Sequence, residues 1–146
     1  MHTFTSQLKA SQTKVLKNIK DINQRRLKFL ELTAAFYNET NRAVVQTAGS
    51  TFCVYSSSKN SPGCAIGRWV RKNSKLDFDI VSPVHDPDVF NFLPIWMKKM
   101  GSEFLRDVQS LHDIDLNWNK KGLNRSRGEE EYKRIKVRIS NEKYVS

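Results

Sequence analysis

The sequence lacks long apolar runs and contains little cysteine. No apolar run approaches the roughly 18–20 residues that a membrane-spanning helix requires. The stretch from Met1 to Lys9 has no hydrophobic core of a secretion signal. Two cysteines, Cys53 and Cys64, are too few for a disulfide framework. These absences argue against a membrane-embedded or disulfide-scaffolded protein, and we expect a reducing, cytoplasmic compartment.

Acidic residues are also scarce, and the resulting positive charge is unevenly distributed. The chain has 25 Lys and Arg against 15 Asp and Glu, a net charge of +10. Residues 1–36 carry seven basic and two acidic residues, and residues 120–146 carry nine and four, so each end has a charge of +5. Residues 37–119 carry nine of each sign. This asymmetry favours an anionic partner, namely nucleic acid, a nucleotide or an acidic protein face, although a solvated basic surface is the simpler interpretation. We expect the two basic ends to converge on one surface.

The composition still supports a single folded domain. The 146 residues include eight Phe, four Tyr and three Trp, which argues against disorder. This length is sufficient for one hydrophobic core.

A seven-residue repeat of apolar side chains predicts a helix near the N-terminus. The repeat covers residues 6–23, and the other faces of the helix are polar and rich in lysine. We expect residues 1–24 to form a basic helix that can project from a compact domain at residues 25–146. The apolar stripe would then dock on a host protein or on a second copy of the chain. Its members are Leu8, Val15, Ile19 and Ile22.

The centre of the chain changes from a helical to a strand-like pattern. A dense apolar run at residues 27–37 predicts a second, more buried helix. The β-forming stretch 51–55 and the short apolar stretch 64–66 predict the two strands of a hairpin. Gly67 then begins a helical turn. A two-stranded hairpin is marginal by itself, so it must pack on the helices.

Two further helices are predicted in the C-terminal half, after a short one at residues 95–100. The stretch 102–113 has apolar residues at helical spacing, with Ser102 as its N-cap. Ser126 and Glu129 have capping-box spacing and predict a last helix from about residue 127. A strand at residues 135–139 is the alternative, because apolar and basic residues alternate there. We therefore predict an α+β single domain, mostly helical, with four to five helices and a small two-stranded hairpin.

Several short motifs follow one another in a characteristic order. They are Cys64-Ala65-Ile66-Gly67-Arg68, Leu93-Pro94, Phe104-Leu105, Gln109-Ser110-Leu111-His112-Asp113, Trp118 and Gly122-Leu123. In this order they resemble a pattern in small uncharacterised proteins of bacteriophages and their bacterial hosts, over roughly residues 29–135. The resemblance carries no established activity. It implies a phage-encoded protein that acts in the host cytoplasm and binds a host factor or an immune signalling nucleotide.

Cys64, His112 and Asp113 are the candidates for catalysis. A cysteine beside an imidazole can act as an activated nucleophile, as in a small hydrolase or transferase, and the bend at Gly67 can expose it. The alternative is that Cys64 is a small buried hydrophobe and that His112 caps the end of its helix. His85-Asp86 is a weaker candidate, because such a pair arises readily by chance in a Pro-rich loop.

Metal and cofactor motifs are incomplete. Cys53, Cys64, His85 and His112 lack the short paired spacings of a zinc site. The stretch 113–117 resembles the start of a calcium loop but lacks its later glycine and glutamate. No glycine-rich phosphate-binding motif occurs. We expect no metal, no cofactor and a non-enzymatic function.

Basic residues near tryptophans are the best candidates for binding an anion. They form two groups in the sequence, beside Trp69 and beside Trp118, and the lysines of the first helix add to them. An exposed tryptophan would stack on a base, whereas a buried one would only anchor the core. The candidates are Arg68, Arg71, Lys72, Lys120, Lys121, Arg125, Arg127, Lys14 and Lys17. The predicted function is non-catalytic binding of nucleic acid or a nucleotide.

Overall fold

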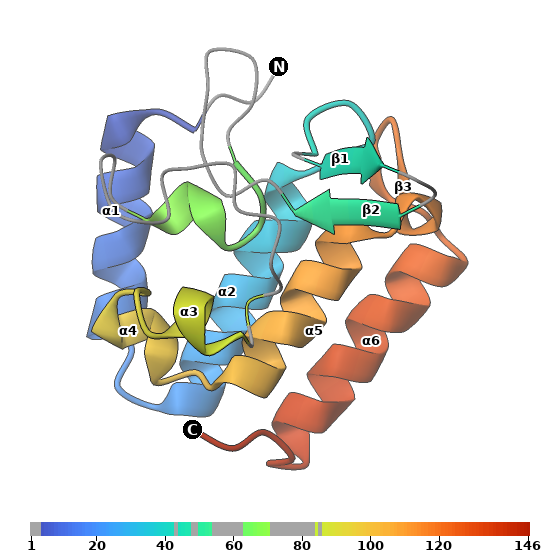
Figure 1. The fold of residues 1–146 in the computed structure, drawn as a ribbon. Coiled ribbons are helices and arrows are strands. Elements are labelled where there is room, and N and C mark those ends of the chain that lie inside the picture. The colour runs from blue at the N-terminus through green and yellow to red at the C-terminus, as the bar shows by residue number, and fades with distance from the viewer. Residues whose placement is uncertain (1–3, 43, 48–49, 54–62, 71–83, 85) are drawn as a thin grey trace.

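The computed structural model describes residues 4–42, 44–47, 50–53, 63–70, 84 and 86–146, of which 44–47 and 50–53 are described by their backbone alone. Figure 1 shows the helices and strands along the chain. The α-helices are α1 (Ser6–Asn18), α2 (Ile22–Phe36), α3 (Pro87–Phe90), α4 (Ile95–Lys98), α5 (Ser102–Asp113) and α6 (Arg127–Ser140). The strands are β1 (Val44–Thr47), β2 (Ser50–Cys53), β3 (Trp118–Asn119) and β4 (Gly122–Leu123), and the 3₁₀ turns are η1 (Gly67–Trp69) and η2 (Asp115–Asn117). The predicted mostly helical α+β fold is confirmed.

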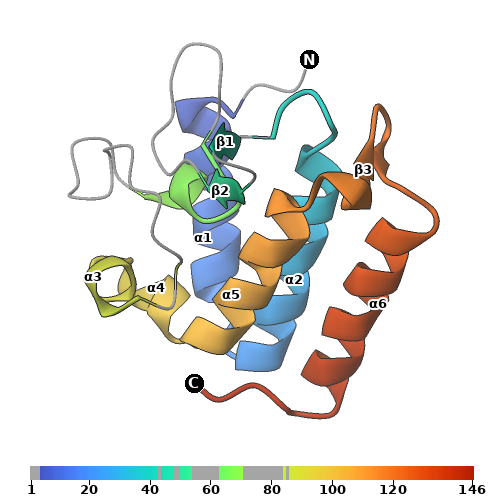
Figure 2. The same cartoon turned by 45° about the vertical axis from the view of Figure 1, so that its right-hand side comes forward.

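Helices α2 and α5 form the centre of the fold. Helix α1 lies on one side of this pair and α6 on the opposite side in Figure 1, and in the turned view α6 is again the outermost helix on its side (Figure 2). The core between them is aromatic: Phe29 of α2 packs against Trp69, Trp96 and Phe104, with ring centroids 5.6–6.3 Å apart. Trp69, Trp96 and Trp118 are all buried. The interpretation of the tryptophans as core anchors is therefore correct, and stacking of a base on an exposed tryptophan is contradicted.

The N-terminal helix is shorter than the predicted span 6–23. It ends at Asn18, and Asp21 then caps a new helix by accepting a hydrogen bond from the Gln24 backbone N–H at 2.8 Å. A side-chain acceptor at this position satisfies one of the free N–H groups at the start of α2. The expected domain boundary after residue 24 falls inside α2. Helix α1 contacts α2, and Leu16 of α1 is fully buried, so residues 4–24 are not a separate projecting unit.

The predicted hairpin has the wrong partner strand. β2 pairs with β1 in antiparallel register, with Val44 opposite Cys53 and Thr47 opposite Ser50. The stretch 64–66 instead leads into η1, where the Arg68 backbone N–H donates to the Cys64 carbonyl at 3.1 Å. The buried apolar run at 64–66 is therefore part of a turn, and the helical turn expected at Gly67 is present.

The starts of α5 and α6 differ in detail from the predicted caps. Gly101, with φ of 87°, is the N-cap of α5, and Ser102 is already helical. Ser126 precedes α6 without a side-chain capping bond. Asn124 takes that role, because its Oδ1 accepts from the Gly128 N–H at 2.8 Å. Helix α6 runs to Ser140, so the strand alternative for residues 135–139 was wrong.

Candidate anion-binding surface

The β3–β4 hairpin presents its two lysines from a firmly anchored turn. Trp118 of β3 is buried, and its indole N–H donates to the Leu111 carbonyl at 2.8 Å. Asn119 accepts from the Lys121 N–H through its side chain at 2.9 Å. Its carbonyl accepts from the Glu39 N–H, also at 2.9 Å, which ties the hairpin to the chain after α2. The turn is thus fixed on both sides, and Lys120 and Lys121 are exposed on it.

An open hollow of about 640 Å³ lies beside this turn. Its lining consists of Glu39, Asn119, Lys120, Lys121 and Arg125. Arg127 follows at the first position of α6. We call Lys120, Lys121, Arg125 and Arg127 the basic hollow. All four side chains are exposed, and within the described part of the chain none forms a salt bridge.

The charge around the basic hollow is mixed. Glu39 lines it, and Glu129 and Glu130 lie in the first turn of α6, where carboxylates interact favourably with the helix dipole. The remaining positive charge is therefore smaller than four lysines and arginines would give. Lys120 and Lys121 lie on the turn between β3 and β4, before the two glutamates of α6 in the chain, and both line the hollow.

Later arginines of α6 are neutralised by carboxylates. Arg138 pairs with Asp107 at 2.6 Å and with Glu103, both on α5. Arg134 pairs with Glu131 at 3.0 Å. The Glu103 hydrogen bond raises the pKa of Arg138 above its ordinary value. Arg138 therefore ties α6 to α5. Lys133, Lys136 and Lys143 are exposed and form no salt bridge among the described residues, so they add positive charge outside residues 120–127.

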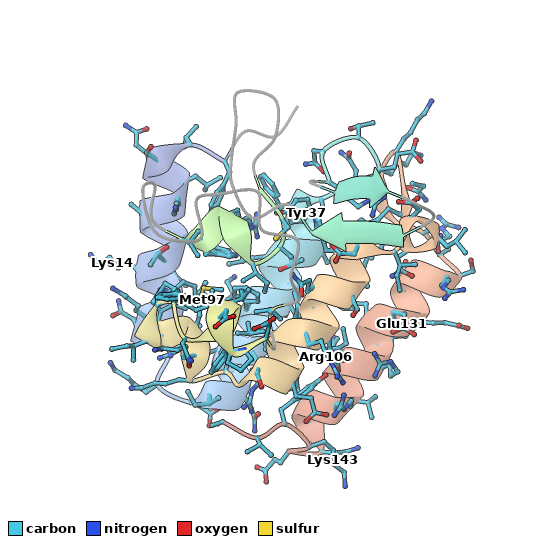
Figure 3. All side chains as sticks on the ribbon, viewed as in Figure 1. Lys14, Tyr37, Met97, Arg106, Glu131 and Lys143 are labelled. Atoms are coloured by element: carbon cyan, nitrogen blue, oxygen red, sulfur yellow. The ribbon has the colours of Figure 1, made fainter. Side chains whose placement is uncertain are left out.

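The basic ends of the chain do not converge. Lys14 and Lys17 are exposed on α1, whereas the basic hollow lies at the start of α6. Figure 3 shows Lys14 on one side of the molecule and Glu131 of α6 on the other. Since α2 and α5 separate these helices, one ligand-sized surface cannot include both ends. The expectation of a shared surface is contradicted.

The group beside Trp69 is not an exposed anion-binding surface either. Arg68 is buried with only 2% of its surface exposed, so it cannot meet a phosphate at the protein surface in this conformation. Arg71 and Lys72 lie outside the described residues. The sequence misled here because a charged residue is normally exposed unless it is paired.

The predicted Cys64–His112 pair does not form a nucleophile and base. Cys64 is fully buried and disulfide-bonded, so it offers no thiolate. His112 is fully buried as well, with its Nδ1 at 2.7 Å from the Asp113 carboxylate and its ring against Tyr37 at 4.5 Å between centroids. Of the sequence prediction, only the His112–Asp113 contact is present.

No metal centre is found in the described part of the chain. Its His, Cys, Asp and Glu residues form no group of three or more that could hold a metal ion. His85 and the Cys53 side chain, two of the zinc candidates, lie outside the described residues.

Burial lowers the pKa of His112 below its ordinary value of 6.5. The hydrogen bond and charge of Asp113 oppose this shift, whereas the positive charges of Arg42 and Arg68 add to it. The unfolded chain therefore takes up a proton at higher pH than the folded protein. The neutral, buried His112 therefore contributes to the free energy of unfolding in full above about pH 6.5. This contribution is lost progressively as the pH falls below that value.

We expect the free energy of unfolding to decrease between pH 7 and pH 5, and His112→Gln to flatten that decrease. Urea unfolding of both proteins at several pH values measures the effect. Equal pH slopes for the two proteins would show that His112 is not a neutral, buried histidine.

The predicted partner stripe is only partly exposed. Leu8 and Val15 are 36% and 46% exposed on α1, whereas Ile19 and Ile22 are half-buried. A groove of about 240 Å³ beside the end of α1 is lined by Ile19, Gln24, Leu27, Lys28 and Glu31. The stripe thus presents two apolar side chains and the edge of a groove. No helix in the described part of the chain is both long and apolar enough to cross a membrane.

Sequence reasoning missed the residues that position the basic hollow. Glu39 lies 80 positions before Asn119 in the chain, yet their backbones are hydrogen-bonded. The only available sequence signal was the run of turn-forming residues from Asn38 to Asn41. No protein-family model, curated protein or solved structure was found to match the chain.

Proposed function

We propose that the protein is a non-catalytic binder of nucleic acid, which it contacts through the phosphate backbone at the basic hollow. The observation that supports this most strongly is the set of exposed, unpaired basic side chains at an open concave surface: Lys120, Lys121 and Arg125 line it, and Arg127 is exposed at the adjoining start of α6. Lysine and arginine bind phosphates and release counterions, which makes such binding strong at low salt. Asn119, which lines the hollow, adds a neutral hydrogen-bonding side chain.

The ligand contacts are expected to be largely independent of base sequence. The tryptophans are buried, so they supply no stacking surface. Phosphate contacts determine position and orientation, whereas base edges determine specificity. The resemblance to small phage proteins adds a setting to this proposal, a phage-encoded protein acting on nucleic acid or a signalling nucleotide in the host cell.

Reversing the charge of the basic hollow tests the proposal. The variant carries Lys120→Glu, Lys121→Glu, Arg125→Glu and Arg127→Glu. We expect its affinity for a 20-base-pair duplex to fall by at least about tenfold at low salt, because phosphate attraction becomes repulsion. Fluorescence anisotropy measures the affinity, and circular dichroism checks that the fold is retained.

A matched control reverses four exposed basic residues, two on α1, one between α1 and α2 and one at the end of α4. It carries Lys14→Glu, Lys17→Glu, Lys20→Glu and Lys99→Glu and has the same net charge. We expect it to retain most of the affinity, because its changes lie away from the basic hollow. Equal losses in the two variants would mean that only net charge matters, and the proposed site would be wrong.

Binding of a partner protein through α1 is a second candidate function. It is favoured by two observations: Leu8 and Val15 are exposed on α1, and a groove of about 240 Å³ lies at the end of that helix. An acidic host protein or a second copy of the chain would suit this surface, since Lys14 and Lys17 lie on the same helix. The size of the purified protein in solution, compared between wild type and a Leu8→Ser, Val15→Ser variant, distinguishes self-association from a monomer.

A further inference from the structure

Arg68 lies in a box of aromatic side chains inside the protein. Its guanidinium carbon is 4.4–5.2 Å from the ring centroids of Phe4, Phe36, Tyr37 and Trp69. The four rings come from the start of α1, the end of α2 and η1. Cation–π attraction of this kind is stronger for a desolvated guanidinium than for an exposed one.

The box supplies rings but no hydrogen-bond acceptor. Nε, Nη1 and Nη2 of Arg68 are all buried and have no hydrogen-bond partner. The indole N–H of the neighbouring Trp69 is likewise buried and unpaired. A buried donor without an acceptor is costly, and a charged one more so.

Two other buried arginines show that the fold can supply acceptors. Arg25 donates to the carbonyls of Lys17, Ile19 and Trp96. Arg26 donates to the Met100 carbonyl, to Asn23 Oδ1 and to Ser146 Oγ. Because both of these guanidinium groups are hydrogen-bonded, the unpaired state of Arg68 is specific to its position.

Arg68 keeps its positive charge at neutral pH. Burial lowers its pKa to about 10, and the hydroxyl of Tyr37 partly offsets the shift. The Tyr37 hydroxyl itself donates to the Gly63 carbonyl at 2.7 Å. No carboxylate in the described part of the chain pairs with Arg68, since Asp113 contacts His112. The box therefore holds an uncompensated cation with five N–H groups available.

Phe4 is the one wall of the box that can move without unpacking a helix. It precedes the first residue of α1 and is only partly buried, whereas Phe36, Tyr37 and Trp69 are buried. Its ring meets Phe36 and Trp69 edge-on, at 5.5 and 5.2 Å between centroids. Displacing Phe4 would open the guanidinium to solvent while the other rings stay in place.

We propose that Arg68 anchors an internal binding site for an oxyanion group, a phosphate or a carboxylate, which enters by displacing Phe4. The guanidinium fork matches two oxygens of either group, and the Trp69 N–H adds a donor beside it. The site is closed in this structure. It is independent of the basic hollow, because none of its residues lines that surface.

The test follows the Arg68 side-chain Nε–H signal of the ¹⁵N-labelled full chain by NMR. Inorganic phosphate and acetate are titrated separately, with ionic strength held constant by sodium chloride. We expect a saturable shift of this signal with at least one of them. A response to phosphate alone assigns the site to phosphate groups, and a response to acetate as well extends it to carboxylates.

Three variants make the result decisive. Phe4→Ala should tighten oxyanion binding by about tenfold or more, because the open form no longer has to be generated. Arg68→Met should abolish the saturable thermal stabilisation by phosphate, and the charge-reversed basic hollow should keep it. No saturable response of the Arg68 signal in either wild type or Phe4→Ala would overturn the proposal. The proposal would also be overturned if phosphate stabilised Arg68→Met against heat as much as it stabilises the wild type. If Arg68→Met does not fold, the NMR titration of the wild type and Phe4→Ala decides the result.

Discussion

Replacing Gly101 by alanine is expected to lower the free energy of unfolding by about 3 kcal/mol or more. Gly101 has φ of 87° and ψ of 145°, a backbone conformation that side chains rarely adopt. A Cβ atom placed there would lie 1.9 Å from the Val145 carbonyl oxygen. The substitution therefore combines backbone strain with a collision against the C-terminal tail.

The tail cannot easily retreat from this collision. Tyr144 is buried, and its hydroxyl donates to Asp107 at 2.6 Å. Burial and that hydrogen bond raise the pKa of Tyr144 above its ordinary value. Ser146 accepts from Arg26 at 3.2 Å. These contacts hold residues 144–146 across the start of α5.

Urea unfolding followed by circular dichroism measures the effect of Gly101→Ala. The neighbouring Ser102→Ala is the matched control, and it should change stability by no more than about 0.5 kcal/mol. In a chain that ends at Tyr144 the Val145 carbonyl is absent, so Gly101→Ala should cost less there than in the full chain. Equal stabilities of Gly101→Ala and Ser102→Ala would contradict this account of the tail.

The sequence predicted well the elements whose signals are local. Phe104, Val108 and Leu111 recur at helical spacing, and all three are buried in α5. The start of α6 was placed correctly at Arg127 for a similar reason, since acidic residues in a first turn and basic residues later are read directly from the chain. Asp21 is a cap signal that was overlooked, and it explains the break between α1 and α2.

The prediction paired β2 with the wrong strand, because both residues 44–47 and residues 64–66 are apolar enough to be its partner. Val44 and Val45 are β-branched, and only two residues separate β1 from β2 in the chain. A short connection with a glycine favours a tight hairpin over a longer loop. The stretch 64–66 is equally apolar, but it is buried as a turn against the helices, which depends on tertiary packing.

The two candidate sites differ in how much of each can be predicted from the sequence. Lys120, Lys121, Arg125 and Arg127 are close together in the chain, so their shared surface follows from short-range geometry. Arg68 was interpreted as a surface residue because its burial depends on rings distant in the chain, Phe4 before α1 and Phe36 and Tyr37 at the end of α2. No local pattern indicates such a box, since Phe4 and Phe36 are separated from Arg68 by 64 and 32 positions.

The separation of the basic ends changes what kind of binding is expected. A single surface that combined the basic residues of both chain ends would make many phosphate contacts, whereas the basic hollow offers four basic side chains. A protein that contacts four phosphates of duplex DNA should show a slope of log affinity against log salt of about −3.6. Its affinity would then fall about 100-fold between 50 and 200 mM salt.

The most direct test of the central proposal is therefore the salt dependence of duplex binding, measured by fluorescence anisotropy for the wild type and for the charge-reversed basic hollow. We predict a slope between about −3 and −4 for the wild type and a slope close to zero for any residual binding of the variant. A wild-type affinity that stays constant over this salt range, or the same slope for both proteins, would contradict phosphate binding at the basic hollow.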